Sequence, residues 1–257
     1  METPSEKNRT LLKNLIVPIF LSCLSVSFTS RPLIQTTNNN DPVIISHTDL
    51  YDPCFTITPN AAEQIYTAIN LQQYGLSMEA FEYAWKGYQY LLKKKQISCS
   101  DYLTICDFSQ SSKQKRLYLI DLTNNELLMN TFVAHGRNSG GEYATKFSNK
   151  PNSLQSSLGF YVTKNTYTGE HGLALKIKGV DPGFNDNAWH RNIVIHGALY
   201  MDDAWLHHSA YMGRSWGCPA LPQKESNTII NTIKNGTCLF IYHPAKNYLL
   251  GSKILNG

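Results

Sequence analysis

The sequence predicts a mainly β domain with a few helices, an α+β protein in which a small helical segment precedes a sheet. Short runs rich in β-branched and aromatic residues recur through the second half of the chain, and no regular strand–helix alternation separates them. The 257 residues, 42% hydrophobic and 16% charged, are enough to bury one substantial core. A doubly wound parallel sheet is therefore disfavoured, and a mainly antiparallel sheet or barrel is preferred.

Residues 1–29 have the layout of an export signal. Basic residues precede an uncharged run over residues 15–28, which is interrupted by Pro18 and is shorter than the roughly 20 apolar residues of a spanning helix. We expect a cleaved signal peptide, with a retained membrane anchor as the alternative. The run also resembles a lipoprotein cleavage site at which Cys23 would be lipidated. The protein is then expected to be exported and either periplasmic or associated with the cell wall. Alternatively, it is exported but stays anchored in the membrane through its N-terminus.

A linker and two helices are expected before the sheet. Residues 30–42 are polar and Asn-rich, which is typical of a linker, and residues 43–98 form the small helical segment. Thr58-Pro59 starts a helical pattern that breaks near Gly75. A second helix runs from its cap at Ser77 to Lys95, because apolar residues there recur at steps of three and four.

Seven β-rich runs and one helix are expected in residues 99–257. The first three runs read as an antiparallel meander, and the only helical pattern among them covers Glu225–Asn235. The expected strands are Tyr102–Phe108, Arg116–Leu122, Leu127–Ala134, Leu158–Thr163, Leu173–Ile177, Ile193–His196 and Thr237–Tyr242.

Charge and cysteine usage limit the partners. The net charge is only +4 and no basic stripe interleaves with aromatic residues, so nucleic acid is not an expected partner. Of the six cysteines, Cys54 and Cys99 bracket the helical segment and are the plausible disulfide, with buried free thiols as the alternative. The histidines lack the spacing of a zinc site, so no metal is expected.

Two short segments carry the residue types that thiol chemistry needs. His196 ends an apolar strand, and Cys218 follows Gly217 within Ser215–Pro222. Acyl transfer by a cysteine requires a thiolate, a base within reach and backbone donors for the developing oxyanion. Gly217 permits a tight turn with unshielded N–H groups, whereas Pro219, which follows Cys218, lacks an N–H. Taken alone, the same residues are also compatible with a small buried cysteine and a structural histidine.

These segments resemble the His-Gly…Ser-His-Gly-Cys signature of the L,D-transpeptidase catalytic domain family, and particularly its murein L,D-transpeptidase branch, in which Ser-Trp-Gly-Cys-Pro-Ala-Leu-Pro appears. The similarity covers roughly residues 95–245 and extends through the segments 135–140, 156–161 and 182–188. The resemblance implies a mixed β-sandwich or barrel over residues 99–257 and no metal or organic cofactor. It implies an acyl-enzyme on Cys218, with His196 as general base and Gly217 in the oxyanion environment. The implied donor is a peptidoglycan stem peptide that loses its terminal D-Ala, and the implied acceptor is an amine on the wall or on a lipoprotein.

One position departs from the family pattern. Trp216 stands where the family usually has a second histidine, and an indole neither accepts nor shuttles a proton. We place Trp216 among the substrate-binding residues together with Ser215, Arg214, Gly197 and Tyr161. Arg214 and Ser215 are expected either to bind a substrate carboxylate or to fix the turn, and Tyr161 either to line the cleft or to pack.

The insert Tyr200–Gly213 is expected to be either a lid or a plain surface loop, from which His207 or His208 can swing over the site. Two other functions remain open for the same residues. Water in place of the amine would make the protein an L,D-carboxypeptidase or endopeptidase. A decayed site, marked by Trp216, would make it a non-catalytic wall-binding module.

Overall fold

The structure, a computed structural model, describes residues 34–36, 42–44 and 61–257 of the chain. The chain divides into two units, residues 1–46 and 47–257. In the first, β1 (Ile34–Thr36) pairs antiparallel with β2 (Pro42–Ile44), so the segment expected to be a linker contains a short hairpin. The predicted signal peptide, Cys23 and Cys54 lie outside the described residues.

The helical segment of the second unit begins with α1 (Ala61–Ile69), followed by the 3₁₀ turn η1 (Leu71–Tyr74) and α2 (Met78–Lys93). The predicted break at Gly75 is confirmed, because this glycine has a φ of 87° and ends η1. The predicted cap is confirmed as well, because the Ser77 hydroxyl accepts a hydrogen bond of 3.2 Å from the N–H of Ala80. None of the described helices is long and apolar enough to cross a membrane.

An eight-stranded sheet forms the body of the second unit, in the order β5-β4-β3-β10-β6-β7-β8-β9. Its pairs are antiparallel except β3–β10 and β8–β9, so the prediction of a mainly antiparallel sheet is confirmed. Each predicted run contains a strand. The strands are β3 (Tyr102–Asp107), β4 (Leu117–Asp121), β5 (Glu126–Thr131), β6 (Gly159–Gly169), β7 (Gly172–Gly179), β8 (Val194–Ala198), β9 (Ala220–Pro222) and β10 (Cys238–Tyr242).

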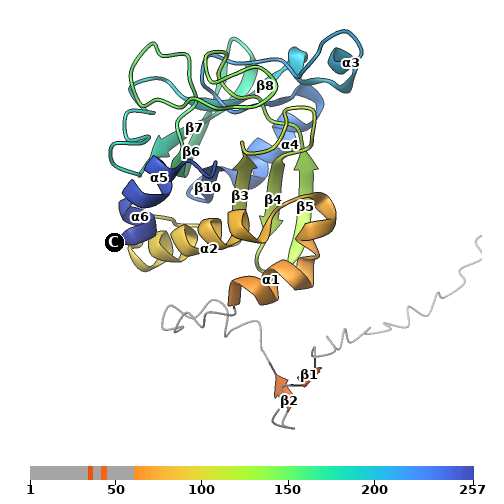
Figure 1. The fold of residues 1–257 in the computed structure, drawn as a ribbon, viewed down its shortest axis with the longest axis vertical. Helices are drawn as coiled ribbons and strands as arrows, with labels where there is room; N and C mark the ends of the chain where they lie inside the picture. Colours follow the sequence, from red (N-terminus) through yellow and green to blue (C-terminus); the bar gives the residue numbers. More distant parts are fainter. Residues whose placement is uncertain (1–33, 37–41, 45–60) are drawn as a thin grey trace, which may run out of the picture. The chain divides into compact units, whose positions relative to one another are not determined.

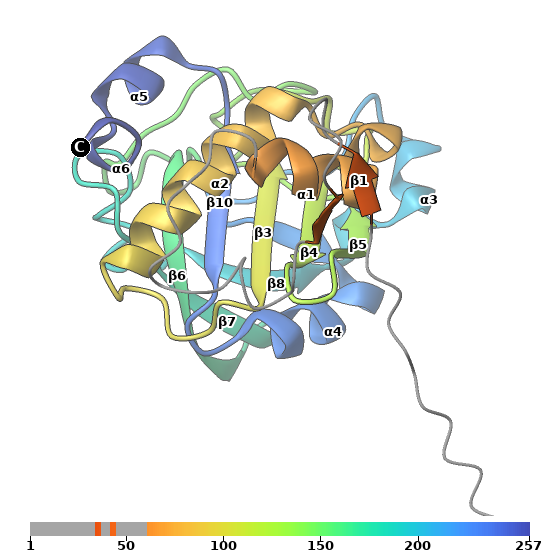
Figure 2. The same ribbon diagram turned by 90° about the horizontal axis from the view of Figure 1, so that it is seen from below.

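Helices cover the sheet and share its core. Helix α2 crosses β3 and β10, and α4 (Gln223–Ile233), the helix predicted for residues 225–235, packs against β7, β8 and β9 (Figure 2). The approach of α2 is closest at Gly87, where a Cβ atom would lie 1.9 Å from Cζ of Phe160. The buried faces of α1 and α2 belong to the same hydrophobic cluster as the strands, so residues 61–98 fold with the sheet as one body.

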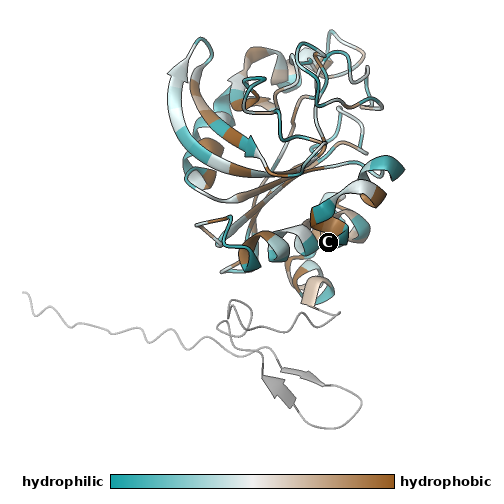
Figure 3. Ribbon diagram, turned by 90° about the vertical axis from the view of Figure 1, so that its left-hand side faces the viewer, coloured by the Kyte–Doolittle hydropathy of each residue, from teal (hydrophilic) through white to brown (hydrophobic). Residues whose placement is uncertain are grey.

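The β6–β7 hairpin is long and curved, and its hydropathy changes along its length (Figure 3). The first half of β6 is buried throughout, whereas its second half alternates and projects a partly exposed face. A register shift between Thr163 and Thr166 separates the halves. Behind this hairpin, the short helices α5 (Lys246–Gly251) and α6 (Lys253–Asn256) are fixed by the buried carboxylate of Asp181, which accepts hydrogen bonds from the hydroxyls of Tyr248 and Ser252.

Candidate active site

The parallel pair β8–β9 joins the two chain segments that carry the predicted base and the predicted nucleophile. His196 of β8 lies opposite Ala220 of β9, and Cys218 is two residues before Ala220. Cys218 lies in the bend that precedes β9, so the pairing places its chain segment beside the strand that carries His196. No strand was predicted at β9, which is only three residues long and starts directly after Pro219.

His196 is held rigidly at the end of β8. Its side chain is 7% exposed, and Nδ1 lies 2.9 Å from the backbone oxygen of Gly197. The exposed His171, from the β6–β7 turn, stacks on its ring at a centroid distance of 4.8 Å. Burial lowers the pKa of His196, the Gly197 contact raises it and the charge of His171 lowers it, so the net shift favours the neutral imidazole.

The thiol of Cys218 is half-buried, and Sγ lies 3.8 Å from the backbone oxygen of Asn192. Burial raises its pKa, while a hydrogen bond from the backbone of Val194 and the charge of Arg191 lower it. Within the described part of the chain, Sγ makes no hydrogen bond to His196. Catalytic hydrogen bonds are often long in a free enzyme and shorten when substrate binds, so a general base need not touch its nucleophile in the free protein.

The turn before the nucleophile is built around Ser215 and Gly217. The Ser215 hydroxyl accepts a hydrogen bond of 3.0 Å from the Gly217 N–H and donates one of 2.6 Å to the Cys218 carbonyl. Gly217 has a φ of 126°, and a Cβ atom there would lie 2.9 Å from the backbone oxygen of Gln155. The backbone N–H of Cys218 donates to no atom of the described residues. A free donor beside a nucleophilic sulfur is suited to bind an oxyanion.

Ser156, which the sequence did not single out, joins the nucleophile turn to the segment at residues 135–140. Its hydroxyl accepts a hydrogen bond from the Gly136 N–H and donates one to the Gly217 carbonyl. Ser215 in turn donates to the carbonyl of His135. His135 itself is buried against Arg116, and burial lowers its pKa to about 3, which keeps it neutral.

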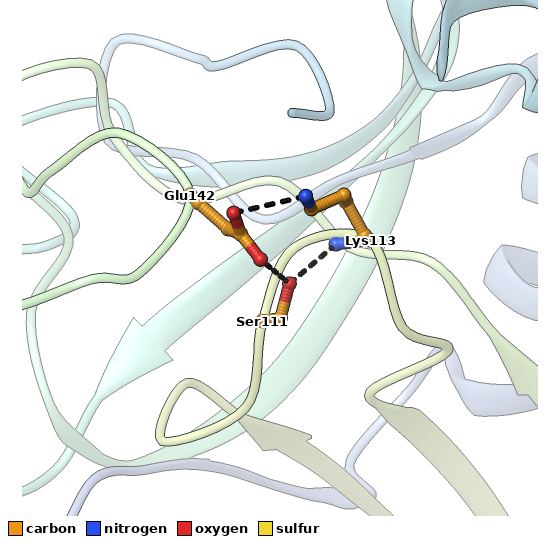
Figure 4. A network of polar contacts seen from close by, with 3 residues as sticks. All are labelled: Ser111, Lys113 and Glu142. Carbon is orange, nitrogen blue, oxygen red and sulfur yellow. Dashed lines mark hydrogen bonds and ion pairs between the residues drawn. The ribbon is translucent and has the colours of Figure 1, made fainter. Parts of the chain in front are cut away.

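The loop beyond Gly136 is fastened to the β3–β4 connection. The carboxylate of Glu142 accepts a hydrogen bond from Ser111 and pairs with Lys113 at 3.1 Å (Figure 4). The backbone of Ser112 also donates to the Glu142 carbonyl. These contacts tie residues 139–146, and through them the nucleophile turn, to the body of the sheet.

Arg191 is a candidate site residue that the sequence did not predict. Its guanidinium donates to the carbonyls of Ser148 and Gln155, at 2.7 and 2.6 Å, and to the hydroxyls of Ser153 and Ser157. All four acceptors are neutral, and no described carboxylate pairs with this half-buried cation. Its Nη2 would lie 3.4 Å from a Cβ atom on Gly217, so the guanidinium lies directly beneath the nucleophile turn. Its lone uncompensated charge favours an anion at Cys218.

The other predicted substrate-binding residues occupy different places. Tyr161 has no exposed surface, and its hydroxyl donates to the Ser157 carbonyl, so in this conformation it packs in the core and does not line a cleft. Gly197 positions His196 through its carbonyl. Trp216 is 74% exposed beside the turn. Arg214 donates hydrogen bonds to the carbonyls of Arg137 and Gly140, which agrees with the expectation that it fixes the turn.

The insert at residues 200–213 is a folded element. It contains η2 (Leu199–Met201) and α3 (Asp203–Leu206), and Met201 and Met212 are buried in a second, small hydrophobic cluster. Tyr200 is half-buried, and burial raises its pKa to about 12 with a smaller contribution from Cys218. His207 and His208 are exposed at the end of α3. The described residues contain no group of three or more His, Cys, Asp or Glu side chains that could hold a metal ion.

The site thus carries a cysteine, a rigidly held histidine and a free backbone donor on neighbouring segments at one end of a mixed sheet. The model of the L,D-transpeptidase catalytic domain family matches residues 72–242, and the chain belongs to this family. The match begins within the helical segment, at η1. No curated protein sequence matches the chain.

Solved structures with similarity to the chain include L,D-transpeptidases of low sequence identity. The enzyme from Mycobacterium smegmatis is 12% identical, with a TM-score of 0.34 over 56% of this chain and 59% of that one. L,D-transpeptidase 3 from Mycobacterium tuberculosis is 10% identical, with a TM-score of 0.37 over 56% and 61%. A domain from Xylanimonas cellulosilytica is 13% identical, with a TM-score of 0.32 over 70% and 93%. The chain therefore spans about three-fifths of the two mycobacterial structures.

Proposed function

We propose that this protein is a cysteine acyltransferase that acts on peptidoglycan stem peptides, with Cys218 as nucleophile and His196 as general base. The observation that carries the proposal is the His196–Gly197 contact of 2.9 Å on the strand beside Cys218. Because this contact keeps the proton on Nδ1, Nε2 is the unprotonated nitrogen that a general base requires. Membership of the family supplies the substrate class.

The reaction proceeds in two acyl transfers. Nε2 of His196 takes the thiol proton as Sγ attacks the carbonyl of the third stem residue, and the Cys218 N–H stabilises the oxyanion. The C–N bond breaks, His196 returns the proton to the departing D-Ala amine, and a thioester remains on Cys218. An acceptor amine then attacks the thioester, loses its proton to His196 and releases the thiol. Arg191 stabilises the thiolate character of Cys218 during attack and release.

The proposed location follows from the substrate. Stem peptides lie outside the cytoplasmic membrane, and the N-terminal layout of a basic start and an uncharged run over residues 15–28 is that of an export signal. We therefore propose a periplasmic or wall-associated protein. Digestion of cells by a protease added outside the cytoplasmic membrane tests this, because a chain that is protected from the protease would contradict it.

The test of the function is intact mass spectrometry of the purified protein mixed with a stem tetrapeptide or a carbapenem. Wild type should gain one acyl group, Cys218→Ala none, and His196→Ala the same group at least about a hundredfold more slowly. Cys99→Ala is the matched control, since Cys99 is a partly exposed free thiol outside the site, and it should react as wild type does. A wild type that gains no acyl group despite a titratable Cys218 thiol would favour a wall-binding module.

Product analysis separates transfer from hydrolysis. With an added amine acceptor, a transpeptidase should convert the acyl group to a new amide, whereas a carboxypeptidase should give the free tripeptide at the same yield with and without acceptor. The amide product is expected.

A further inference from the structure

A cavity opens beside the nucleophile turn, with a volume of about 450 Å³. This volume lies within the range of roughly 300–1,000 Å³ that small-molecule sites occupy. Helix α3 and the loops that enclose the cavity gather at the end of the sheet where β8 also ends (Figure 1). We call it the Trp–Arg pocket; its lining consists of Arg137, Trp205, Ser209, Ala210, Tyr211, Met212, Gly213, Arg214 and Trp216.

The charge of the Trp–Arg pocket is uniformly positive. Arg137 and Arg214 are its only charged lining residues, and no carboxylate lines it. Acids nearby are engaged elsewhere: Glu142 binds Ser111 and Lys113, and Asp202 accepts a hydrogen bond from the N–H of Ala204. Among the described residues, neither arginine of the pocket has an ion-pair partner. Two guanidinium groups without a counter-charge favour an anionic ligand.

The two arginines differ in how they are held. Arg214 is fixed, because Nη1 donates to two backbone carbonyls and the guanidinium lies 5.0 Å from the centroid of the Tyr211 ring. Its Nε and Nη2 donate to no atom of the described residues. The side chain of Arg137 makes no hydrogen bond there either, and its exposed guanidinium is available to a ligand. A fixed and an adjustable guanidinium together suit bidentate recognition of a carboxylate.

Aromatic rings form the remaining wall. Trp216 is 74% exposed and Trp205 42%, and Nε1 of Trp205 is fixed by a hydrogen bond of 3.2 Å to the Tyr211 carbonyl. Exposed indole faces offer flat apolar surfaces against which a peptide or sugar can stack. Trp216 lines the pocket and lies two residues before Cys218, so the pocket adjoins the turn that carries the reacting sulfur.

We propose that the Trp–Arg pocket binds a free carboxylate of the stem peptide and positions the peptide for attack by Cys218, with Arg137 and Arg214 as its ligands. This inference rests on the proposed function and specifies how its substrate is recognised. The shared chemistry is a carboxylate. It can come from the C-terminal residue of the peptide or from an internal acidic residue.

The test is calorimetric titration of the full-length Cys218→Ala protein, which cannot turn the peptide over, with a synthetic stem tetrapeptide. Three peptides are compared: the free acid, the C-terminal amide and the peptide amidated at its internal carboxylate. Arg137→Gln should weaken binding of the free acid by about tenfold, the usual effect of one lost charge-assisted hydrogen bond. Arg137→Gln should not weaken binding of the peptide in which the carboxylate that the pocket binds has been amidated. The amide that shows this loss of effect therefore identifies the bound carboxylate as the C-terminal or the internal one.

Lys86→Gln is the matched control, since it removes one exposed positive charge from α2, away from the pocket. Arg214→Lys gives a second variant, which keeps the positive charge but loses the planar guanidinium that can form two parallel hydrogen bonds to a carboxylate. The proposal is overturned if Arg137→Gln binds every peptide as Lys86→Gln does. If the wild-type protein converts the free acid and both amides with equal KM, the proposed recognition of a carboxylate by the pocket is overturned, but the proposed function is not. A wild type that neither binds nor acylates with any peptide would overturn the proposed function with it.

Discussion

The Nδ1 atom of His196 lies 2.9 Å from the backbone oxygen of Gly197, and this contact decides which ring nitrogen can act as the base. A carbonyl oxygen only accepts, so Nδ1 carries the proton and Nε2 carries the lone pair. The acceptor belongs to the next residue of the same strand, which makes the orientation of the ring a local property of β8. No carboxylate is needed to orient it.

The pH dependence of acylation should reveal His196. Burial, and more weakly the charge of His171, hold its pKa below the usual 6.5, so the imidazole is neutral at pH 7. The rate should therefore decrease as the pH falls, with its midpoint below the 6.5 of an ordinary imidazole. His171→Phe keeps an aromatic neighbour and removes the charge, so the transition should move to higher pH. The measurement is the rate of carbapenem acylation as a function of pH. If the transition does not move in His171→Phe, His171 does not affect the pKa of the base.

Replacement of Arg191 should raise the pKa of the Cys218 thiol, because the guanidinium charge favours the thiolate. Arg191→Gln should therefore react with iodoacetamide at Cys218 several-fold more slowly at neutral pH, and its alkylation profile should move to higher pH. Arg191→Lys keeps a positive charge but not the four hydrogen bonds. It therefore distinguishes the effect of the charge on the thiol from the effect of the hydrogen bonds that hold residues 148–157 in place. If all three proteins share one profile, Arg191 has a purely structural role.

Arg191 also illustrates what the sequence could not predict. Its partners at residues 148–157 are 34 to 43 positions away, and both segments are polar loops without periodicity. The strands, the Ser77 cap and helix α4 were predictable because they rest on local spacing. Tyr161 is the converse case: the β-rich run Leu158–Thr163 placed it correctly on a strand, but only tertiary packing, such as that of α2 on Phe160, determines that both faces of the first half of β6 are buried.

A side chain at position 217 should disable the nucleophile turn. Gly217→Ala combines an unfavourable φ of 126° with a Cβ atom 2.9 Å from the Gln155 carbonyl, so we expect acylation to fall by at least about tenfold. Gly183→Ala is the control, since Gly183 also has a positive φ, of 83°, but no atom lies within 4 Å of its Cβ position. Equal rates for the two variants would show that the turn tolerates the displacement.

His135 should make the fold sensitive to acid. Its pKa is lowered to about 3 by burial and by Arg116, far below the ordinary 6.5 of an unfolded chain. The unfolded state therefore binds a proton that the folded state refuses, and stability is lost as the pH falls from about 6.5 toward 3, by at most about 1.4 kcal/mol per pH unit. His135→Asn removes the titration, and its thermal midpoint should decline less steeply between pH 6.5 and 4. Parallel declines would assign the acid sensitivity to other groups.

Gly87→Ala tests how closely α2 approaches the sheet. Alanine favours a helix over glycine by about 1 kcal/mol, so an open site would be stabilised by the change. At Gly87, however, the new methyl group would lie 1.9 Å from Cζ of Phe160, a ring with no exposed surface that stacks on Phe240 at 4.1 Å. Overpacking of a core costs about 1–3 kcal/mol, so the clash should outweigh the propensity and lower the free energy of unfolding in urea. The double variant Gly87→Ala/Phe160→Leu should recover part of the loss, because leucine vacates the space that the methyl group needs; a single variant more stable than wild type would mean that α2 can move away from β6 at no cost.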